Sequence, residues 1–349
     1  MTYRKGSKMH KHDTAYWEKY YKFWDDFVGA WFTSMQSQKD RNIAERIAMQ
    51  FGNASSINLD ELPEPYYGKP HEDVDAVFIN LNPGMSTEDG LESTKFFSKL
   101  IVPYPEGWLI KKFAKTKSYR DYANGCSCLD PNLRAHNPEV CGVKWWQDLA
   151  PKPIGGRMSW VRRIYNNANM CPSKVFALEL CPFHSKRWEF DLTENRSLKD
   201  FINEHVIEPA VIATIENGLP FAIAVGASIR DVLAHAGATK EREWVCEGKN
   251  RQRKLSEDVL DIWPQWEDGR LIVRCYRLYR IQREGKFARI LVTWAAGGNT
   301  CPQEGFNGVE QRIRQYVYDN SVGGVVCSTD DCACDMVEVP IAKEASTNL

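Results

Sequence analysis

The chain has 349 residues, of which 43% are hydrophobic and 26% are charged, so it is long enough to bury a large core. Its formal net charge is −1, whereas a dedicated nonspecific nucleic-acid binder is usually strongly basic. Any nucleic-acid contact must come from local clusters of basic residues, namely Lys111, Lys112, Lys115 and Lys117 or Arg157, Arg162 and Arg163. A lysine face that only contacts solvent explains the first of these clusters as well as nucleic-acid binding does.

No uninterrupted apolar run approaches membrane length, and residues 1–13 are polar and basic without the apolar centre of a signal peptide. The chain has 11 cysteines, and Cys181 and Cys275 fall inside predicted strands. This distribution indicates reduced thiols rather than a disulfide framework. We therefore expect a soluble, cytoplasmic monomer with no membrane partner.

Four soft metal ligands lie close together in a loop rich in Gly, Asn and Pro. They are Cys126, Cys128, His136 and Cys141, and tetrahedral sulfur and nitrogen ligands suit a structural zinc ion. The Cys-x-Cys spacing is tighter than that of ordinary zinc sites, so unligated loop cysteines are the other reading. We predict no cofactor and keep zinc as the alternative.

An aromatic stripe at helical spacing marks the amino-terminal part of the chain. Its members recur at i, i+3, i+4 and i+7, which predicts an amphipathic helix. Bases could stack on such a stripe, but this regularity is more typical of a core. A second helix stops at Gly52-Asn53, and the two form a helical extension over residues 1–58. The stripe consists of Trp17, Tyr20, Tyr21, Trp24, Phe27, Val28, Trp31 and Phe32.

Residues 75–85 read as a buried strand that ends abruptly in a turn. The apolar run of residues 76–79 predicts the strand, and Asn82-Pro83-Gly84 supplies the turn. Pro83 fixes φ, whereas Gly84 lets a ligand approach the backbone closely. Because ligands of open α/β sheets bind at the carboxyl ends of the strands, this turn is a candidate site.

Three later segments have the character of partner strands: Val175–Cys181, Phe221–Val225 and Arg289–Trp294. Each is a short apolar run that ends in a small or polar loop. Together with residues 76–79, they predict an α/β fold with a central parallel sheet of about four strands flanked by helices.

The remaining segments give three further expectations. Ser197 reads as the N-cap of a helix that Pro209 interrupts. Residues 240–257 are highly charged and read as a surface excursion. Residues 270–283 and 287–294 alternate around a Glu-Gly-Lys turn, which predicts a hairpin.

The order of the four strand segments and the motif Asn80-Leu81-Asn82-Pro83-Gly84 resemble the uracil-DNA glycosylase superfamily, closest to its Asn-bearing mismatch-specific branches. The loop Pro65–Pro70 is similar to the loop that precedes this motif in those proteins. The resemblance implies one glycosylase-like domain over residues 1–320, followed by an acidic tail over residues 321–349. Residues 85–174 then form a long insertion, which either covers the pocket mouth or is decorative and faces solvent.

The activity that the resemblance implies is that of a DNA glycosylase. Such an enzyme flips a nucleotide out of DNA and hydrolyses its N-glycosidic bond, which leaves an abasic site. The site needs a positioned water and donors for the departing base. Asn82 would orient the water through its amide carbonyl, whereas in the alternative reading Asn82 only caps its own turn.

Glu179 and His184 complete the catalytic candidates. A buried carboxylate is costly, and Glu179 could accept a hydrogen bond from the exocyclic amine of cytosine or, if protonated, donate to the departing base. The alternative is that Glu179 turns away and pairs with the Arg162/Arg163 face. His184 could donate to the base or to a phosphate, or it could cap its loop.

The other candidates follow from the same resemblance and from the loops at the ends of the strands. The expected base-binding residues are Asn80, Pro83, Gly84, Met85 and Phe183. The expected contacts to the DNA backbone are Gly68, Ser185, Lys186, Ser228, Gly297, Gly298 and Asn299.

The last loop departs from the pattern of the superfamily. Uracil-excising members usually carry a His-Pro-Ser-Pro loop there, but residues 295–302 contain no histidine. This departure, Glu179 and the insertion favour a modified pyrimidine over uracil, such as (glucosylated) hydroxymethylcytosine in phage DNA, and hence a role in antiviral defence. The alternatives are a uracil or mismatch repair glycosylase, a catalytically silent DNA-binding module, and a nucleoside hydrolase.

Overall fold

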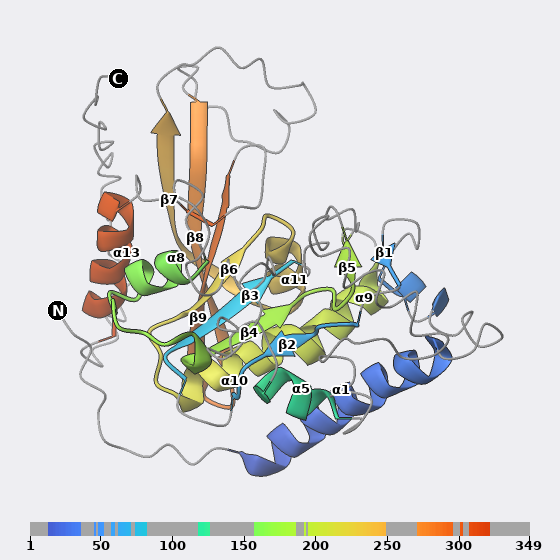
Figure 1. The fold of residues 1–349 in the computed structure, drawn as a ribbon. Coiled ribbons are helices and arrows are strands. Elements are labelled where there is room, and N and C mark those ends of the chain that lie inside the picture. Colours follow the sequence, from blue (N-terminus) through green and yellow to red (C-terminus); the bar gives the residue numbers. More distant parts are fainter. Residues whose placement is uncertain are drawn as a thin grey trace, which may run out of the picture.

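The computed structural model describes residues 13–35, 45–46, 48–51, 57–59, 62–70, 74–81, 118–125, 157–185, 192, 195–248, 271–295, 301–302 and 307–321. Figure 1 shows that these residues form an α/β fold, with helices on both faces of one large sheet. The α/β class predicted from the strand segments is therefore confirmed. The described helices are α1 (Thr14–Met35), α5 (Tyr119–Gly125), α8 (Arg157–Ile164), α9 (Arg196–Ile202), α10 (Glu208–Glu216), α11 (Ile229–His235) and α13 (Asn307–Asp319), with a short 3-10 turn at Pro172–Lys174.

The sheet has seven strands in the order β2-β4-β3-β6-β9-β8-β7. Its central strands β4, β3, β6 and β9 run parallel, whereas β2, β8 and β7 are antiparallel to their neighbours. All four predicted segments lie in this sheet, which is larger than expected because β2, β7 and β8 extend it. The strands are β2 (Tyr66–Tyr67), β3 (Ala76–Asn80), β4 (Val175–Glu179), β6 (Ala222–Val225), β7 (Thr239–Gly248), β8 (Leu271–Arg283) and β9 (Lys286–Ala295); β1 (Ile57–Asn58) and β5 (His184–Ser185) form a separate pair.

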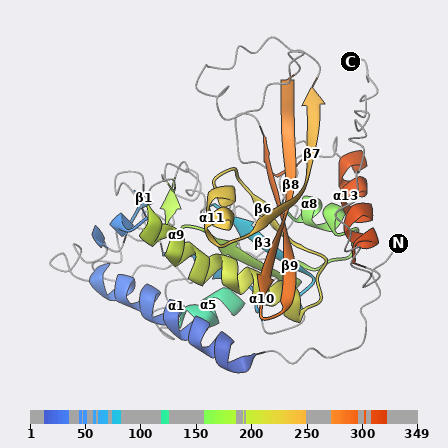
Figure 2. The same cartoon turned by 180° about the vertical axis from the view of Figure 1, so that it is seen from behind.

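Each face of the sheet has its own core. Because side chains alternate along a strand, Val77 and Ile79 of β3 pack with α1, α9, α10 and α11, whereas Ala76 and Phe78 pack with α8 and α13. We call these the α1 face and the α13 face. Figure 2 shows the long β7–β8–β9 arm from behind, with α13 to one side of it.

The aromatic stripe of α1 is core, as the sequence predicts. Trp17, Trp24 and Trp31 are fully buried, and the ring of Trp17 meets that of Phe176 edge to face at 6.0 Å. The Trp17 Nε1 also donates to Glu216 Oε2 at 2.8 Å, which ties α1 to the end of α10. The stripe therefore anchors the helical extension to the sheet.

Two predictions about the segment 195–248 are wrong. The N-cap of α9 is Asn195, whose side chain accepts from the Leu198 N–H, and Pro209 does not end the helical run. A π-helical turn at Asn203–Ile207 joins α9 to α10. Pro209 lies in the first turn of α10, where the backbone N–H that proline lacks is not needed for a hydrogen bond within that helix. The charged stretch that begins at residue 240 forms most of β7 rather than a surface excursion.

The predicted hairpin is confirmed, and α5 is the first described part of the insertion. The pairing of β8 with β9 begins beside the turn with Arg283 and Lys286 and continues to Arg274 and Ala295. Gly285 in the turn has φ +76°. In α5 the Tyr119 hydroxyl donates to the Tyr66 carbonyl at 2.7 Å, and Arg120 pairs with Glu18 of α1. This part of the insertion packs beside α1 and β2.

None of the described helices is long and apolar enough to span a membrane.

Candidate functional site

The carboxyl ends of β3 and β4 are in register, and each strand ends in a polar residue. Four apolar residues precede Asn80 in β3 and four precede Glu179 in β4, and the pairing places Asn80 opposite Glu179. Backbone hydrogen bonds continue past the strands, from Leu180 N–H to Asn80 O at 3.0 Å and from Cys181 N–H to Leu81 O at 2.9 Å. The chain that leads into residue 82 is therefore held against the chain that follows Glu179.

The side chains of Asn80 and Glu179 bond to each other. Asn80 Nδ2 donates to Glu179 Oε1 at 2.8 Å, and the two residues are only 2% and 3% exposed. Alternation places both on the α13 face, one residue beyond Ile79 and Leu178. Because a buried carboxylate must be hydrogen-bonded to be tolerated, the amide both stabilises Glu179 and fixes its orientation.

The arginines that Glu179 was expected to meet in the alternative reading are engaged elsewhere. Arg163 of α8 donates from Nε to Glu310 Oε2 of α13 at 2.6 Å and from Nη2 to the carbonyl oxygen of Pro302 at 2.8 Å. Arg162 Nε donates to the Met170 carbonyl oxygen at 3.0 Å. Arg163 therefore serves the packing of α8 on α13, which argues against its use as a DNA contact.

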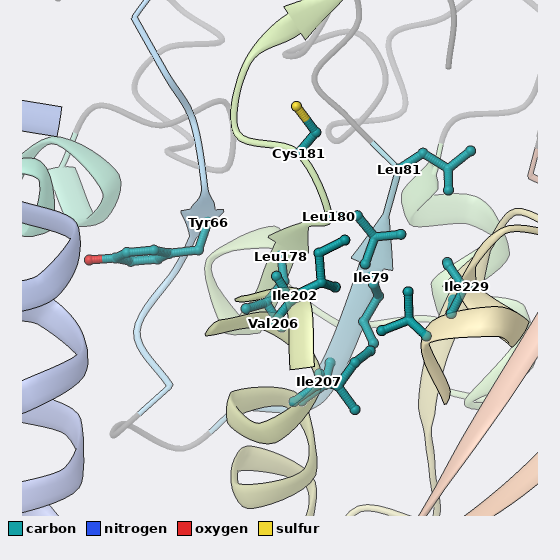
Figure 3. Close-up of a cluster of buried hydrophobic side chains, with 14 of the residues drawn as sticks. Tyr66, Ile79, Leu81, Leu178, Leu180, Cys181, Ile202, Val206, Ile207 and Ile229 are labelled. Atoms are coloured by element: carbon teal, nitrogen blue, oxygen red, sulfur yellow. The ribbon is translucent and has the colours of Figure 1, made fainter. Parts of the chain in front are cut away.

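Apolar side chains line the same strand ends on the α1 face. Figure 3 shows Leu81, Leu180 and Cys181 beyond Ile79 and Leu178, with Ile229 of α11 close by. Burial raises the pKa of the Cys181 thiol, so the thiol stays protonated and is a poor nucleophile. This side of the strand ends is packing rather than chemistry.

Gly226, at the end of β6, makes room for this packing. Its φ is +127°, and a Cβ there would lie 2.7 Å from the Leu81 side chain. The absence of a side chain lets Leu81 lie across the end of β6.

His184, Phe183 and Ser185 lie beyond Glu179, but their contacts are structural. His184 Nε2 lies 3.2 Å from Glu64 Oε2, which also accepts from the Tyr67 hydroxyl, so the imidazole stabilises the loop as in the alternative reading. The ring of Phe183 is fully buried in the aromatic core, 5.6 Å from that of Phe51. The prediction that Phe183 binds a base stays a prediction, but its ring would first have to leave this packing. Ser185 is buried in β5, which pairs with β1.

Gly68 lies at the other end of β4. Its φ is +85°, and a Cβ would lie 2.2 Å from the carbonyl oxygen of Val175, the first residue of that strand. Val175 and Glu179 are four residue steps apart along β4, which corresponds to about 13 Å. The glycine is therefore explained by the close approach of two backbones, and not by contact with DNA at the carboxyl end.

A polar group on the α13 face was not anticipated from the sequence. Arg274 of β8 is 3% exposed, and its Nη1 donates to Thr293 Oγ1 of β9 at 3.2 Å. Burial lowers the pKa of the Arg274 guanidinium. The Thr293 hydroxyl donates in turn to the Cys275 carbonyl oxygen at 3.0 Å. The sequence does not indicate that Arg274 is buried, because alternation along a strand does not tell which of its two faces turns toward the core.

Ser228 lies at the carboxyl end of β6, where it precedes α11 and makes no side-chain cap to that helix. Within the described part of the chain, no three His, Cys, Asp or Glu side chains gather as metal ligands would. Several predicted site residues lie outside the described residues: Asn82, Pro83, Gly84, Met85, Lys186, Gly297, Gly298, Asn299 and the zinc candidates Cys126, Cys128, His136 and Cys141.

The structure thus brings together two predicted residues, Asn80 and Glu179, at the carboxyl ends of two parallel strands immediately before residue 82. Such a pair can accept hydrogen bonds from an amine and can hold a base by its polar edge. Comparisons of the chain with family models, with curated proteins and with solved structures give no match.

Proposed function

We propose that the chain is a DNA base-excision glycosylase, related to the uracil-DNA glycosylase superfamily, with its base pocket at the carboxyl ends of β3 and β4. The observation that supports this proposal is the buried Asn80–Glu179 pair, which stands directly before Asn82-Pro83-Gly84. Ligands of parallel α/β sheets bind at this end of the strands. A carboxylate buried there on a rigid strand can read a ligand without reorganising.

The reaction would be hydrolysis of the N-glycosidic bond of a flipped nucleotide. The bond between C1′ and the base breaks with its electron pair on the base, a water oxygen bonds to C1′, and a water proton passes to the base or to solvent. Asn82 would orient this water through its amide oxygen. Because an amide cannot take up the proton, the reaction depends on a base that leaves readily.

Glu179 would choose the base. A carboxylate accepts a hydrogen bond from the exocyclic amine of cytosine and repels the carbonyl oxygen that uracil carries at the same position. Asn80 keeps the carboxylate aimed, because its Nδ2 is bonded to Oε1. We therefore propose a cytosine derivative as the substrate, of the (glucosylated) hydroxymethylcytosine type found in phage DNA, and a role in antiviral defence.

A catalytically silent DNA-binding module is the second candidate. It is favoured by the burial of Asn80 and Glu179 and by the hydrogen bond between them, since a pair kept only for stability would look the same. In that case, loss of Asn82 would leave the protein's DNA binding intact.

The test is incubation of the protein with duplexes that carry uracil, a mismatch, hydroxymethylcytosine or its glucosylated form, with abasic sites scored by alkaline cleavage. We expect cleavage at the modified cytosine, abolished by Asn82→Ala and strongly reduced by Glu179→Gln. The matched control is Glu284→Gln, an exposed glutamate in the β8–β9 turn. Equal cleavage at plain uracil would overturn the substrate, and DNA binding without cleavage of any duplex would favour the silent module.

A further inference from the structure

Trp294 is the last inward-facing residue of β9, at the same end of the sheet as Asn80 and Glu179. Its side chain packs on the α1 face and is 2% exposed. It is followed by Ala295, the final residue of the strand, and then by the loop that departs from the superfamily pattern. Trp294 is therefore a firmly packed residue close to the end of β9.

Two guanidinium groups lie over the indole of Trp294. The Arg230 Cζ is 4.6 Å and the Arg277 Cζ 5.3 Å from the ring centroid. Arg277 is neutralised by Glu243, because its Nη2 lies 2.8 Å from Glu243 Oε2. Of the two arginines that stack on this ring, Arg277 thus has its charge neutralised by an ion pair, and Arg230 is the other.

Arg230 has no carboxylate partner among the residues that the structure describes. Its Nε donates to the carbonyl oxygen of Ala227 at 3.0 Å, which together with Trp294 fixes the direction of the side chain. The side chain remains partly exposed. A fixed guanidinium that has used Nε internally still carries the Nη donors, which suit the oxygens of a phosphate group.

The position of Arg230 matches that of a contact beside the base pocket. Arg230 lies in the first turn of α11, which follows β6, and β6 separates the strands of Asn80 and Trp294. Glu179 lies on β4, one strand further on, so three strand spacings, or about 14 Å, separate its strand from that of Trp294. A DNA strand that crosses the carboxyl ends from one face of the sheet to the other could therefore reach Arg230 on the α1 face and present a base to Glu179 on the α13 face.

We propose that Arg230, held by Trp294, binds a DNA phosphodiester next to the flipped nucleotide. The inference rests on DNA being the ligand of this end of the sheet, as in the proposed function. In a chain with a formal net charge of −1, such a fixed cation supplies attraction that the overall charge does not. The contact carries no sequence information, since a phosphate is the same beside every base.

The experiment measures affinity for a fluorescent duplex at several salt concentrations, with the wild-type protein and the Arg230→Gln and Arg230→Lys variants. Arg230→Gln should weaken binding to every duplex alike and reduce the slope of log K against log salt by about 1. Arg230→Lys should keep the slope, because it keeps the charge. The matched control is Arg280→Gln, since Arg280 also stacks on an aromatic ring, Phe287 at 3.9 Å, but lies near the β8–β9 turn at the other end of the sheet.

The outcomes separate this inference from the proposed function. An unchanged salt slope in Arg230→Gln, or an equal loss in Arg280→Gln, overturns the inference while base excision stands. A reduced slope specific to Arg230→Gln in a protein that excises no base supports the inference and counts against the glycosylase. A wild-type protein that binds no DNA contradicts both.

Discussion

The two faces of the sheet bury their titratable groups in different ways. On the α13 face, Glu310 is fully buried, and Arg163 forms two hydrogen bonds to it across the seam between α8 and α13. On the α1 face, His205 in the π-helical turn stacks on Phe23 with ring centroids 3.7 Å apart. Burial lowers the pKa of this imidazole to about 4, so it is neutral at pH 7.

Burial by itself does not mark a carboxylate as functional. Glu310 is more buried than Glu179, yet its guanidinium partner and its place between two helices explain it as scaffold. Glu179 accepts from a neutral amide at the end of a strand. A buried carboxylate therefore suggests chemistry when its position is one that a ligand can reach, and structure when it joins two packed elements.

Removing one partner of the charged seam should have the largest effect. Glu310→Ala leaves the mostly buried guanidinium of Arg163, whose side chain is only 18% exposed, without its counter-charge. We expect a loss of about 3–5 kcal/mol in the free energy of unfolding. Urea denaturation measures it. The double variant Arg163→Met with Glu310→Leu should recover most of the loss, and a single variant within 1 kcal/mol of wild type would remove the distinction between the two faces.

Gly68→Ala should be nearly as damaging, and for a steric reason alone. The new Cβ would meet the Val175 carbonyl oxygen at 2.2 Å in a backbone with φ +85°, for which we expect a loss of about 3 kcal/mol. Gly237→Ala is the matched control, because its φ is +76° but its Cβ would meet open space. Excision per folded molecule should stay unchanged; a selective loss of DNA binding would return Gly68 to the site.

Glu179→Gln should lower activity rather than stability, in contrast to a loss of Glu310 on the same face. The amide oxygen of glutamine can still accept from Asn80 Nδ2, so the free energy of unfolding should change by less than about 1 kcal/mol. Base excision should fall about 100-fold, since the charge that reads the exocyclic amine is lost. A variant that is strongly destabilised but fully active per folded molecule would show that Glu179, like Glu310, serves only the scaffold.

His205 should make the α1 face sensitive to acid. Its folded pKa of about 4 lies below the ordinary value of 6.5, so its contribution to stability is complete above pH 6.5 and is lost as the pH falls toward 4. Between pH 8 and pH 5 we expect a loss of about 2 kcal/mol. Urea midpoints of wild type and His205→Phe at both pH values measure it, and equal pH dependence in the two proteins would contradict the assignment.

Most of the scaffold could be predicted because it rests on local periodicity. The aromatic spacing of α1, the apolar runs of β3 and β4 and the turn around Gly285 each encode their own structure. β7 was missed because buried Trp244 and Cys246 lie in a strand that is otherwise rich in charged residues, such as Glu243 and Glu247, so that its sequence resembles a solvated segment.

Side-chain partners could be predicted far less well. Asn80 and Glu179 were each identified as site residues, but their hydrogen bond joins residues 99 positions apart and depends on the order and register of the strands. The Arg163–Glu310 pair spans 147 positions and depends on how two helices dock. The stack of Arg230 on Trp294 likewise left no local pattern, since it is set by the packing of α11 on β9.

The two outermost strands in the described part of the sheet bear on how copies of the chain meet. β2 is only two residues long and is followed at once by Gly68, so it offers little backbone for pairing. β7 is longer, but it has two register shifts against β8 and exposes Lys240 and Arg242. Short borders, irregular pairing and charged side chains each oppose strand-to-strand association between molecules. Concentrated solutions of the protein should therefore resist β-type aggregation.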